Sequence, residues 1–322
     1  MKLTLSALNR AVPLWPQLAA IVALMAIGSV LIEGFASFGS IISLLVLASI
    51  VAIAASGQTN VALLGSIDLS IPAVMAMANV MTAALTNSGW PFILVAALIV
   101  LFSVVIGAFN GLISMALQIN ALVITLATGS IVGGAILAWT GGAPTGLAPR
   151  WLFQFVAPSG TVLGGPIPAV LVLWFVFAAV QMFVQRRTVF GRWIYATGSN
   201  SQAAQIAGVP TTLVWSVTFA ASAASAGLAG VLLAGFTSQG DVRASAPFLF
   251  STVACVVIGG TSMVGAQGGY GRTILGAIIL TVMTSLLVAL GLTVALQQAI
   301  LGALIILVVA SYGREDAVAA RL

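Results

Sequence analysis

The residue best suited to chemistry in this chain is Asp68, one of only five acidic residues among 322. It stands in the segment 65–72, which reads GSIDLSIP and separates two long apolar runs. An ionised carboxylate at membrane depth is costly, so a residue of this kind faces protein or water and usually has a function. The Gly, Ser and Pro residues around it also interrupt the helical pattern. The segment therefore predicts a polar break inside a membrane protein.

Few other residues in the chain are suited to catalysis or to metal binding. There is no His, and the single Cys, Cys255, lies inside an apolar run. A disulfide within the chain is excluded, and a His- or Cys-based metal or nucleophile site is not expected. The chain has no Gly-x-x-x-x-Gly-Lys-Ser/Thr loop, so it cannot bind ATP in the usual way. We expect no catalytic residue, no metal site and no cofactor held by this chain.

The composition indicates a protein solvated by lipid. Hydrophobic residues make up 61% and charged residues 5%, and the mean hydropathy is +1.23, whereas a soluble domain carries roughly 25% charged residues. The ten basic residues are scattered at segment ends and do not form a continuous basic strip. The net charge of +5 therefore does not indicate nucleic-acid binding.

About twenty apolar residues cross a bilayer as a helix, and the pattern predicts an all-α membrane protein with about ten such spans in one domain, 16–311. An alternative with eight spans also has an even number, so it too would put both termini on the same side of the membrane. The ten expected spans are 16–34, 40–57, 69–86, 91–117, 121–140, 168–185, 212–236, 247–265, 272–290 and 294–311.

Basic residues orient these spans, because cytoplasmic loops carry the excess of Lys and Arg. With ten spans, four groups of basic residues fall on one side of the membrane. Both termini, 1–15 and 312–322, are then cytoplasmic. The four groups are Lys2 with Arg10, Arg186 with Arg187 and Arg192, Arg272, and Arg314 with Arg321.

Two loops are long enough to have a role. In the outside loop, about 141–167, Pro and Gly argue against a plain helix. Its aromatic residues Trp151, Phe153 and Phe155 are either an interfacial anchor or a docking patch for an extracytoplasmic partner.

The inside loop, about 186–211, contains a short predicted helix. Asn200 or Ser201 suits its N-cap, 202–207 form two turns, and Gly208 with Pro210 ends it. It is either a spacer packed against the membrane or a lever held by a cytoplasmic subunit.

Five motifs in this order resemble those of bacterial ABC importer permeases for simple sugars, the ribose type, which are related to branched-chain amino acid permeases. The resemblance covers about 50–315. The chain departs from the family pattern at Ser66, Pro72, Asn120-Ala121 and Gln267. The motifs lie at 65–70 (GSIDLS), 110–112 with 124–128 (NGL and ITLAT), 140–142 (TGG), 195–209 (YATGSN, with Ala203, Ala204, Gly208 and Val209) and 257–268 (VIGGTS, with Gly265 and Gly268).

The resemblance implies an assembly and a mechanism. Two permease subunits, identical or different, form a dimer in the bacterial cytoplasmic (inner) membrane. A periplasmic or lipid-tethered binding protein delivers the solute, and cytoplasmic ABC ATPases use the ATP. The Ile-Asp-Leu-Ser motif favours a sugar over a branched-chain amino acid. The ATPase-coupling residues would be Gly198, Asn200, Gln202, Ala203, Ala204 and Gly208.

Residues of the translocation path or of a structural motif would be Asp68, Ser70, Asn110, Thr125, Thr261 and Ser262. Three interpretations of Asp68 stay open: a cap of a helix that starts near Leu69, a ligand of sugar hydroxyls, or a carrier of a coupled proton. Further polar residues within spans have no assigned role, and the small-residue run 220–230 is expected to pack helices together. These further residues are Gln58, Asn79 and Thr128.

Two other function classes compete with the importer. An ion-coupled secondary transporter is the first, although a single intramembrane acid and the lack of His weigh against a proton relay. An intramembrane enzyme is the second, and the sequence offers it few catalytic groups. A faint likeness between 65–66 and 259–262 also suggests a duplicated half.

Overall fold

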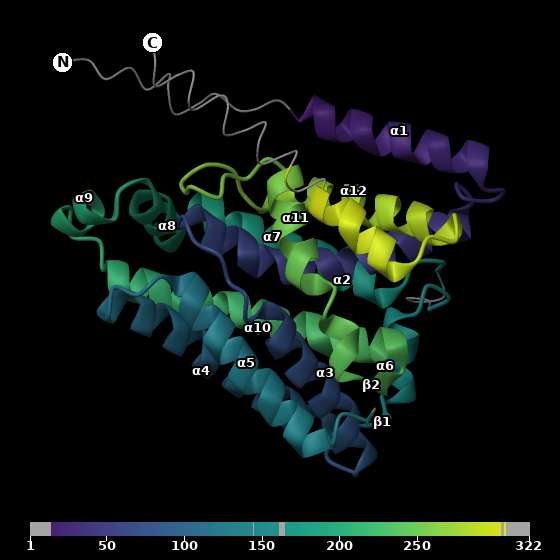
Figure 1. The fold of residues 1–322 in the computed structure, drawn as a ribbon, viewed down its shortest axis with the longest axis horizontal. Coiled ribbons are helices and arrows are strands. Elements are labelled where there is room, and N and C mark those ends of the chain that lie inside the picture. Colours follow the sequence, from purple (N-terminus) through teal and green to yellow (C-terminus); the bar gives the residue numbers. More distant parts are fainter. Residues whose placement is uncertain (1–13, 144, 161–164, 304–305, 307–322) are drawn as a thin grey trace.

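The computed structural model describes residues 14–143, 145–160, 165–303 and 306. Most of the two predicted cytoplasmic termini and the end of the last predicted span lie outside these residues. The described chain is predominantly helical, which agrees with the all-α membrane class (Figure 1).

The described fold contains twelve labelled α-helices, one short 3₁₀-helix and two very short strands, and a further apolar helix, Val294–Ala303, follows α12. The helices are α1 (Trp15–Leu31), α2 (Phe38–Leu63), α3 (Ile71–Asn87), α4 (Phe92–Ala116), α5 (Ala121–Thr140), α6 (Arg150–Val156), α7 (Ala169–Arg187), α8 (Val189–Ser199), α9 (Ser201–Ile206), α10 (Thr211–Thr237), α11 (Phe248–Ile258) and α12 (Tyr270–Ala289), with the 3₁₀-helix η1 (Val242–Ser245) and the strands β1 (Thr145–Leu147) and β2 (Gln239–Gly240).

Six of the described helices are long and apolar enough to cross a membrane: α2, α4, α5, α7, α10 and α12. Four shorter apolar helices coincide with the remaining expected spans, at Trp15–Leu31, Ile71–Asn87, Val242–Ile258 and Val294–Ala303. The structure thus supports a polytopic permease-like bundle, while the count of ten spans stays a prediction.

The eighth expected span, 247–265, is corrected by the structure. Helix α11 ends at Ile258 because Gly259 and Gly260 follow it, and Gly260 has a φ of +83°. Residues 259–269 form a non-helical segment between α11 and α12, which we call the inner segment. Non-helical backbone at membrane depth needs protein or a cavity around it.

Helix α10 lies at the centre of the bundle. It packs against α4, α3 and α2, while α11 and α12 pack on α2, and α1 packs on α12 (Figure 1). Glycines allow the closest contacts: a Cβ at Gly230 would lie 2.9 Å from Met75 Cα, and one at Gly107 would lie 2.7 Å from Ala220 Cα. The expectation that the run 220–230 packs helices together is confirmed.

Two different faces of the molecule lie at the two ends of α10. Its 27 residues rise about 40 Å at 1.5 Å per residue. Helices α8 and α9 precede its first residue, whereas β2 and η1 follow its last, and the two groups lie at opposite ends in Figure 1. Strands β1 and β2 pair antiparallel. They cover the C-terminal half of α3, where the Asp241 N–H donates to Asn79 Oδ1 at 2.8 Å.

The contact between α4 and α10 can be tested by replacing one glycine at the contact with valine. Gly107→Val forces a side chain into the α10 backbone at Phe219 and Ala220, and overpacking of this kind costs about 1–3 kcal/mol. We expect a lower Tm for the purified protein in detergent. Gly134→Val in α5 is the control, because no heavy atom lies within 4 Å of the Cβ position at Gly134. Equal melting temperatures for the two variants would contradict this packing.

Candidate functional site

Residues 64–70, which we call the strap, connect α2 to α3 without helical structure. Gly65 has a φ of +78°, a conformation that glycine adopts readily and that ends α2. Pro72 is the second residue of α3, where a missing N–H has no cost. The local sequence therefore requires the chain to leave one helix and enter the next through a non-helical segment.

The carboxylate of Asp68 is buried at the end of the strap, with a relative exposure of 2%. Its Oδ1 accepts hydrogen bonds from Ser70 N at 2.9 Å and from Ser70 Oγ at 2.5 Å. Its Oδ2 accepts from the Ser222 hydroxyl of α10 at 2.8 Å. Both oxygens are thus occupied, and the carboxylate joins the start of α3 to the central helix.

Side chains from α2 and α5 bind the backbone of the strap. The N–H of Asp68 donates to Gln58 Oε1 at 3.2 Å, and the N–H of Leu69 donates to Thr125 Oγ1 at 3.0 Å. Buried backbone groups outside a helix need such partners. The strap is therefore held by polar groups of two neighbouring helices as well as by its own carboxylate.

Six buried polar residues from four helices and the strap form one group, which we call the polar cluster. Asn110 of α4 completes it by donating from Nδ2 to Ser70 Oγ at 3.2 Å. Two atoms of the cluster have no hydrogen-bond partner within the described chain: Gln58 Nε2 and Asn110 Oδ1. These two spare atoms, a donor and an acceptor, suit a water molecule or a solute hydroxyl. The cluster consists of Gln58, Asp68, Ser70, Asn110, Thr125 and Ser222.

The structure brings together four of the six residues expected in the path or motif. Asp68, Ser70, Asn110 and Thr125 meet in the polar cluster. The other two lie in the inner segment and build its turns. Thr261 Oγ1 accepts from Gly269 N at 3.1 Å, and the Ser262 hydroxyl accepts from Val264 N at 3.1 Å.

Asp68 does not cap α3 in the expected way. The helix begins at Ile71, its N-cap residue is Ser70, and that residue makes no side-chain cap hydrogen bond. The helix starts two residues after the expected Leu69, and the Leu69 N–H lies in the non-helical strap, where it donates to Thr125. Asp68 instead orders the turn just before the helix through the Ser70 N–H.

Sequence reasoning missed Ser222, which it placed in a run of small packing residues. A hydroxyl facing the core from an Ala-rich helix was the available signal. Gln58 was noted as an intramembrane polar residue without an assigned role. Thr128, noted in the same way, donates only to backbone carbonyls of its own helix.

The predicted short helix of the inside loop is confirmed as α9. Asn200 is its N-cap, and Asn200 Oδ1 accepts from Ala203 N at 2.9 Å. Gly208, with a φ of +83°, follows its end. Gln202 and Ala203 are exposed, Ala204 is buried, and Gly198 lies in the preceding helix α8.

The outside loop contains α6, although Pro and Gly were expected to exclude a plain helix. This seven-residue helix starts directly after Pro149 and ends before Pro158, so neither proline has to donate an N–H within it, and the Pro149 carbonyl accepts from Leu152 N at 2.9 Å. Trp151 and Phe153 are half exposed, whereas Phe155 packs against the core. The ring of Trp151 contacts Phe92 edge-on, with 4.7 Å between centroids.

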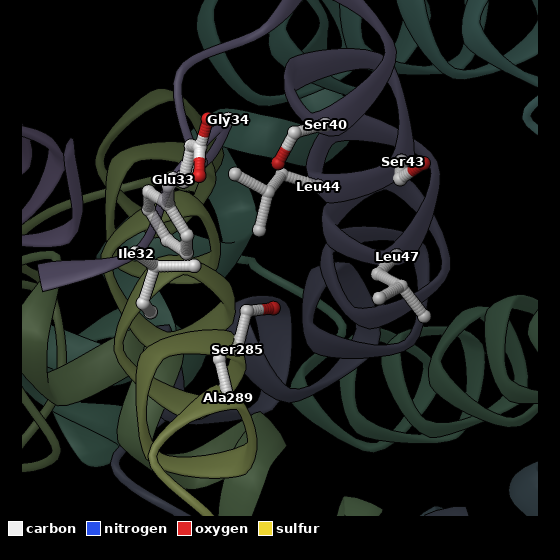
Figure 2. A pocket seen from close by; sticks show the side chains of 10 residues that line it. Ile32, Glu33, Gly34, Ser40, Ser43, Leu44, Leu47, Ser285 and Ala289 are labelled. Carbon is white, nitrogen blue, oxygen red and sulfur yellow. The ribbon is translucent and has the colours of Figure 1, made fainter.

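A separate cavity of about 310 Å³ lies between the α1–α2 turn, α2 and α12 (Figure 2). Its polar lining consists of Glu33 and three serines, and the remainder is mainly apolar. It shares no residue with the polar cluster. The serines are Ser40, Ser43 and Ser285.

A comparison with known families identifies the class of protein to which the chain belongs. The family described as "Branched-chain amino acid transport system / permease component" matches residues 40–309. The chain belongs to this family of transport permeases. It is therefore a transport component and not an enzyme.

Several curated proteins are similar to this permease over most of their length. The ribose import permease protein of Haemophilus influenzae is 32% identical over 292 residues, which cover 90% of this chain and 89% of that protein. The ribose import permease protein of Bacillus subtilis is 33% identical, covering 89% and 88%. The autoinducer 2 import system permease protein of Escherichia coli is 32% identical, covering 83% and 77%. No solved structure matches the permease significantly.

The role of the Asp68 charge can be tested by two substitutions. Asp68→Asn keeps an acceptor for Ser70, and the Ser222 hydroxyl can turn to accept from the new amide. Asp68→Leu leaves the buried hydroxyls of Ser70 and Ser222 without the carboxylate, at about 1–3 kcal/mol for each unsatisfied group. We expect a small fall in Tm for the Asn variant and a large one for the Leu variant, measured on the purified permease in detergent. Equally large falls would show that the cluster requires the charge itself.

Proposed function

We propose that this permease forms the membrane path of an ATP-driven importer for a simple sugar or a sugar-like solute. The observation that carries the proposal is the end-to-end similarity to two ribose import permeases. The similarity to autoinducer 2 import permeases supports the same solute class more broadly. Two amide atoms of the polar cluster, Gln58 Nε2 and Asn110 Oδ1, have no partner within the described chain, and amide groups of this kind can bind solute hydroxyls.

The proposed assembly contains a second permease subunit, a cytoplasmic ABC ATPase and an extracytoplasmic binding protein. The ATPase binds and hydrolyses the ATP, and this chain holds no cofactor. We place α8 and α9 at the cytoplasmic face and α6 at the outer face of the bacterial inner membrane, with both termini cytoplasmic and ten crossing segments. The positions of α8–α9 and α6 at opposite ends of the bundle support opposite faces, and Arg186, Arg187 and Arg192 beside α8 favour the cytoplasmic side for that end.

Helix α9 offers a suitable contact for the ATPase. It carries no charged side chain, and Ile206 at its end is 89% exposed. A large apolar side chain in this position fits an apolar pocket of a partner, as the anchors of protein interfaces do. Sequence reasoning placed the helix but did not single out Ile206.

The ion-coupled alternative has little support in the geometry. Both oxygens of Asp68 accept hydrogen bonds from this chain. The other members of the polar cluster carry no charge, so the cluster has no second carboxylate to pass a proton on. An ATP-driven mechanism needs no such relay.

The proposal is tested by purifying the tagged permease from its native membrane in mild detergent and identifying the proteins that accompany it. We expect an ATPase with a phosphate-binding Gly-x-x-x-x-Gly-Lys-Ser/Thr loop. Cells that contain the complex should take up radiolabelled ribose faster than cells that lack the permease, and uptake should need ATP. Absence of any ATPase, even after chemical crosslinking, would contradict the importer and favour the secondary transporter.

The contact made by Ile206 is tested by its replacement with Asp. A charge buried in an apolar pocket is strongly unfavourable, so Ile206→Asp should abolish recovery of the ATPase with the permease. Because Ile206 is exposed, the variant permease itself should express and melt normally. Ile206→Leu is the matched control and should retain the ATPase. Normal ATPase recovery by the Asp variant would show that α9 does not make this contact.

A further inference from the structure

Three glycines bring the backbones of three elements into direct contact. Gly65 begins the turn after α2, Gly198 is near the end of α8, and Gly265 lies in the inner segment. A Cβ at Gly265 would lie 2.6 Å from Gly198 O and 3.2 Å from Gly65 N. A Cβ at Gly65 would lie 2.9 Å from Val264 O. Since only glycine allows such an approach, we call this contact the glycine junction.

Gly198 is the most tightly placed of the three. A Cβ at this position would overlap the carbonyl oxygen of Leu63, the last residue of α2, and would lie 3.2 Å from Ala266 N. That carbonyl already accepts a hydrogen bond from Ala266 N at 2.9 Å. The end of α2, the end of α8 and the inner segment are thus joined at one point without intervening side chains.

A second set of hydrogen bonds strengthens the link between α8 and the inner segment. The Tyr195 hydroxyl of α8 donates to Gly268 O at 2.9 Å. Burial raises the pKa of the Tyr195 phenol, more than the nearby Arg186 and Arg272 lower it, so the hydroxyl is protonated and donates at neutral pH.

Helix α7 is tied to the same region through Gln185. Its Nε2 donates to Asn60 Oδ1 of α2 at 2.7 Å, and its Oε1 accepts from Tyr270 N at the start of α12 at 2.9 Å. Gln185 thus holds α2 and the start of α12 together, while a displacement of α8 moves the inner segment and the end of α2 or breaks the contacts of Gly198 and Tyr195.

The glycine junction also lies next to the polar cluster along the chain. Gly65 is a strap residue, and Asp68 follows it in the same strap. The strap is fastened beyond this point by Gln58, Thr125 and Ser222. The junction is thus the place where the α8–α9 face meets the segment that carries the buried carboxylate.

We propose that the glycine junction, together with the hydrogen bond from Tyr195 to Gly268 beside it, transmits the movement of α8 and α9 to the strap when the ATPase closes on ATP. Gly65, Gly198 and Gly265 are then positioning residues for energy coupling. The proposal rests on the proposed function as an ATP-driven permease and extends it by naming the contact that carries the movement. Backbone atoms in direct contact have no rotamers that could absorb a displacement, and packed interfaces pass such shifts on.

A reporter on the strap tests this link without knowledge of the solute. Ser66 is partly exposed, whereas Cys255, the only Cys of the chain, is fully buried. Ser66→Cys therefore gives a single accessible thiol in this chain. The complex purified with its ATPase is labelled with a fluorescent maleimide, with and without ATP and vanadate, and the permease band is measured after electrophoresis. We expect a labelling-rate change of roughly threefold or more, a size typical of coupling between sites.

Two substitutions at the junction should remove this response while leaving the ATPase bound. Gly198→Ala pushes α8 away from Leu63, and Tyr195→Phe removes only the hydrogen bond to Gly268. We expect the labelling change to fall to less than about twofold in both variants, with recovery of the ATPase retained because its proposed contact, Ile206 of α9, is unchanged. Gly133→Ala, on the open face of α5 with no atom within 4 Å, is the control and should keep the full response.

Each outcome bears on the proposal. An unchanged response in the Tyr195→Phe variant, or in a folded Gly198→Ala variant, would overturn the role of the junction. A reporter that does not respond to ATP and vanadate, although ATPase is bound and active, would overturn movement of the strap. Absence of an ATPase from the purified complex would instead contradict the proposed function itself, and the coupling role with it.

Discussion

The backbone of the strap must satisfy its hydrogen bonds without helical structure inside an apolar bundle. Lipid offers no partner for a free N–H or C=O group, so non-helical backbone at membrane depth has to be bound by protein. Here Gln58 and Thr125 accept from two strap N–H groups, and Asp68 accepts from a third. The burial of several polar side chains in otherwise apolar helices follows from this single requirement.

Close helix packing is what brings those side chains within reach of the strap. Ser222 can donate to Asp68 because α10 approaches α2 closely: a Cβ at Gly57 would lie 2.5 Å from Ser222 Cα. Membrane helices gain little from a hydrophobic effect between them, so contacts between small residues supply much of their association. The glycines and alanines of α10 therefore position the polar cluster as well as stabilising the bundle.

Close packing has a different result at the end of the bundle that carries α8 and α9. The contact there is between backbones, at Gly65, Gly198 and Gly265, and it joins two non-helical segments to the end of α8. Polar contacts hold the strap at one end, and direct backbone contacts hold it at the other. A permease that changes access to its path needs an element with two such attachments, because a segment free at either end could not pass on a movement.

The sequence alone determined the membrane class, the apolar segments and the place of the polar break, because composition and hydropathy act locally along the chain. It also placed α9, since the cap Asn200 and the terminating Gly208 are local signals. Only the tertiary structure decided which polar residues meet: it joined Asn110 and Thr125 to Asp68, added Ser222, and left Thr261 and Ser262 in the inner segment. The early end of α11 and the bounds of α6 follow instead from local glycine and proline signals that the hydropathy pattern does not record. The physical reason is that hydrogen bonds between residues 154 positions apart, as between Asp68 and Ser222, depend on how the helices pack and leave no local pattern in the chain.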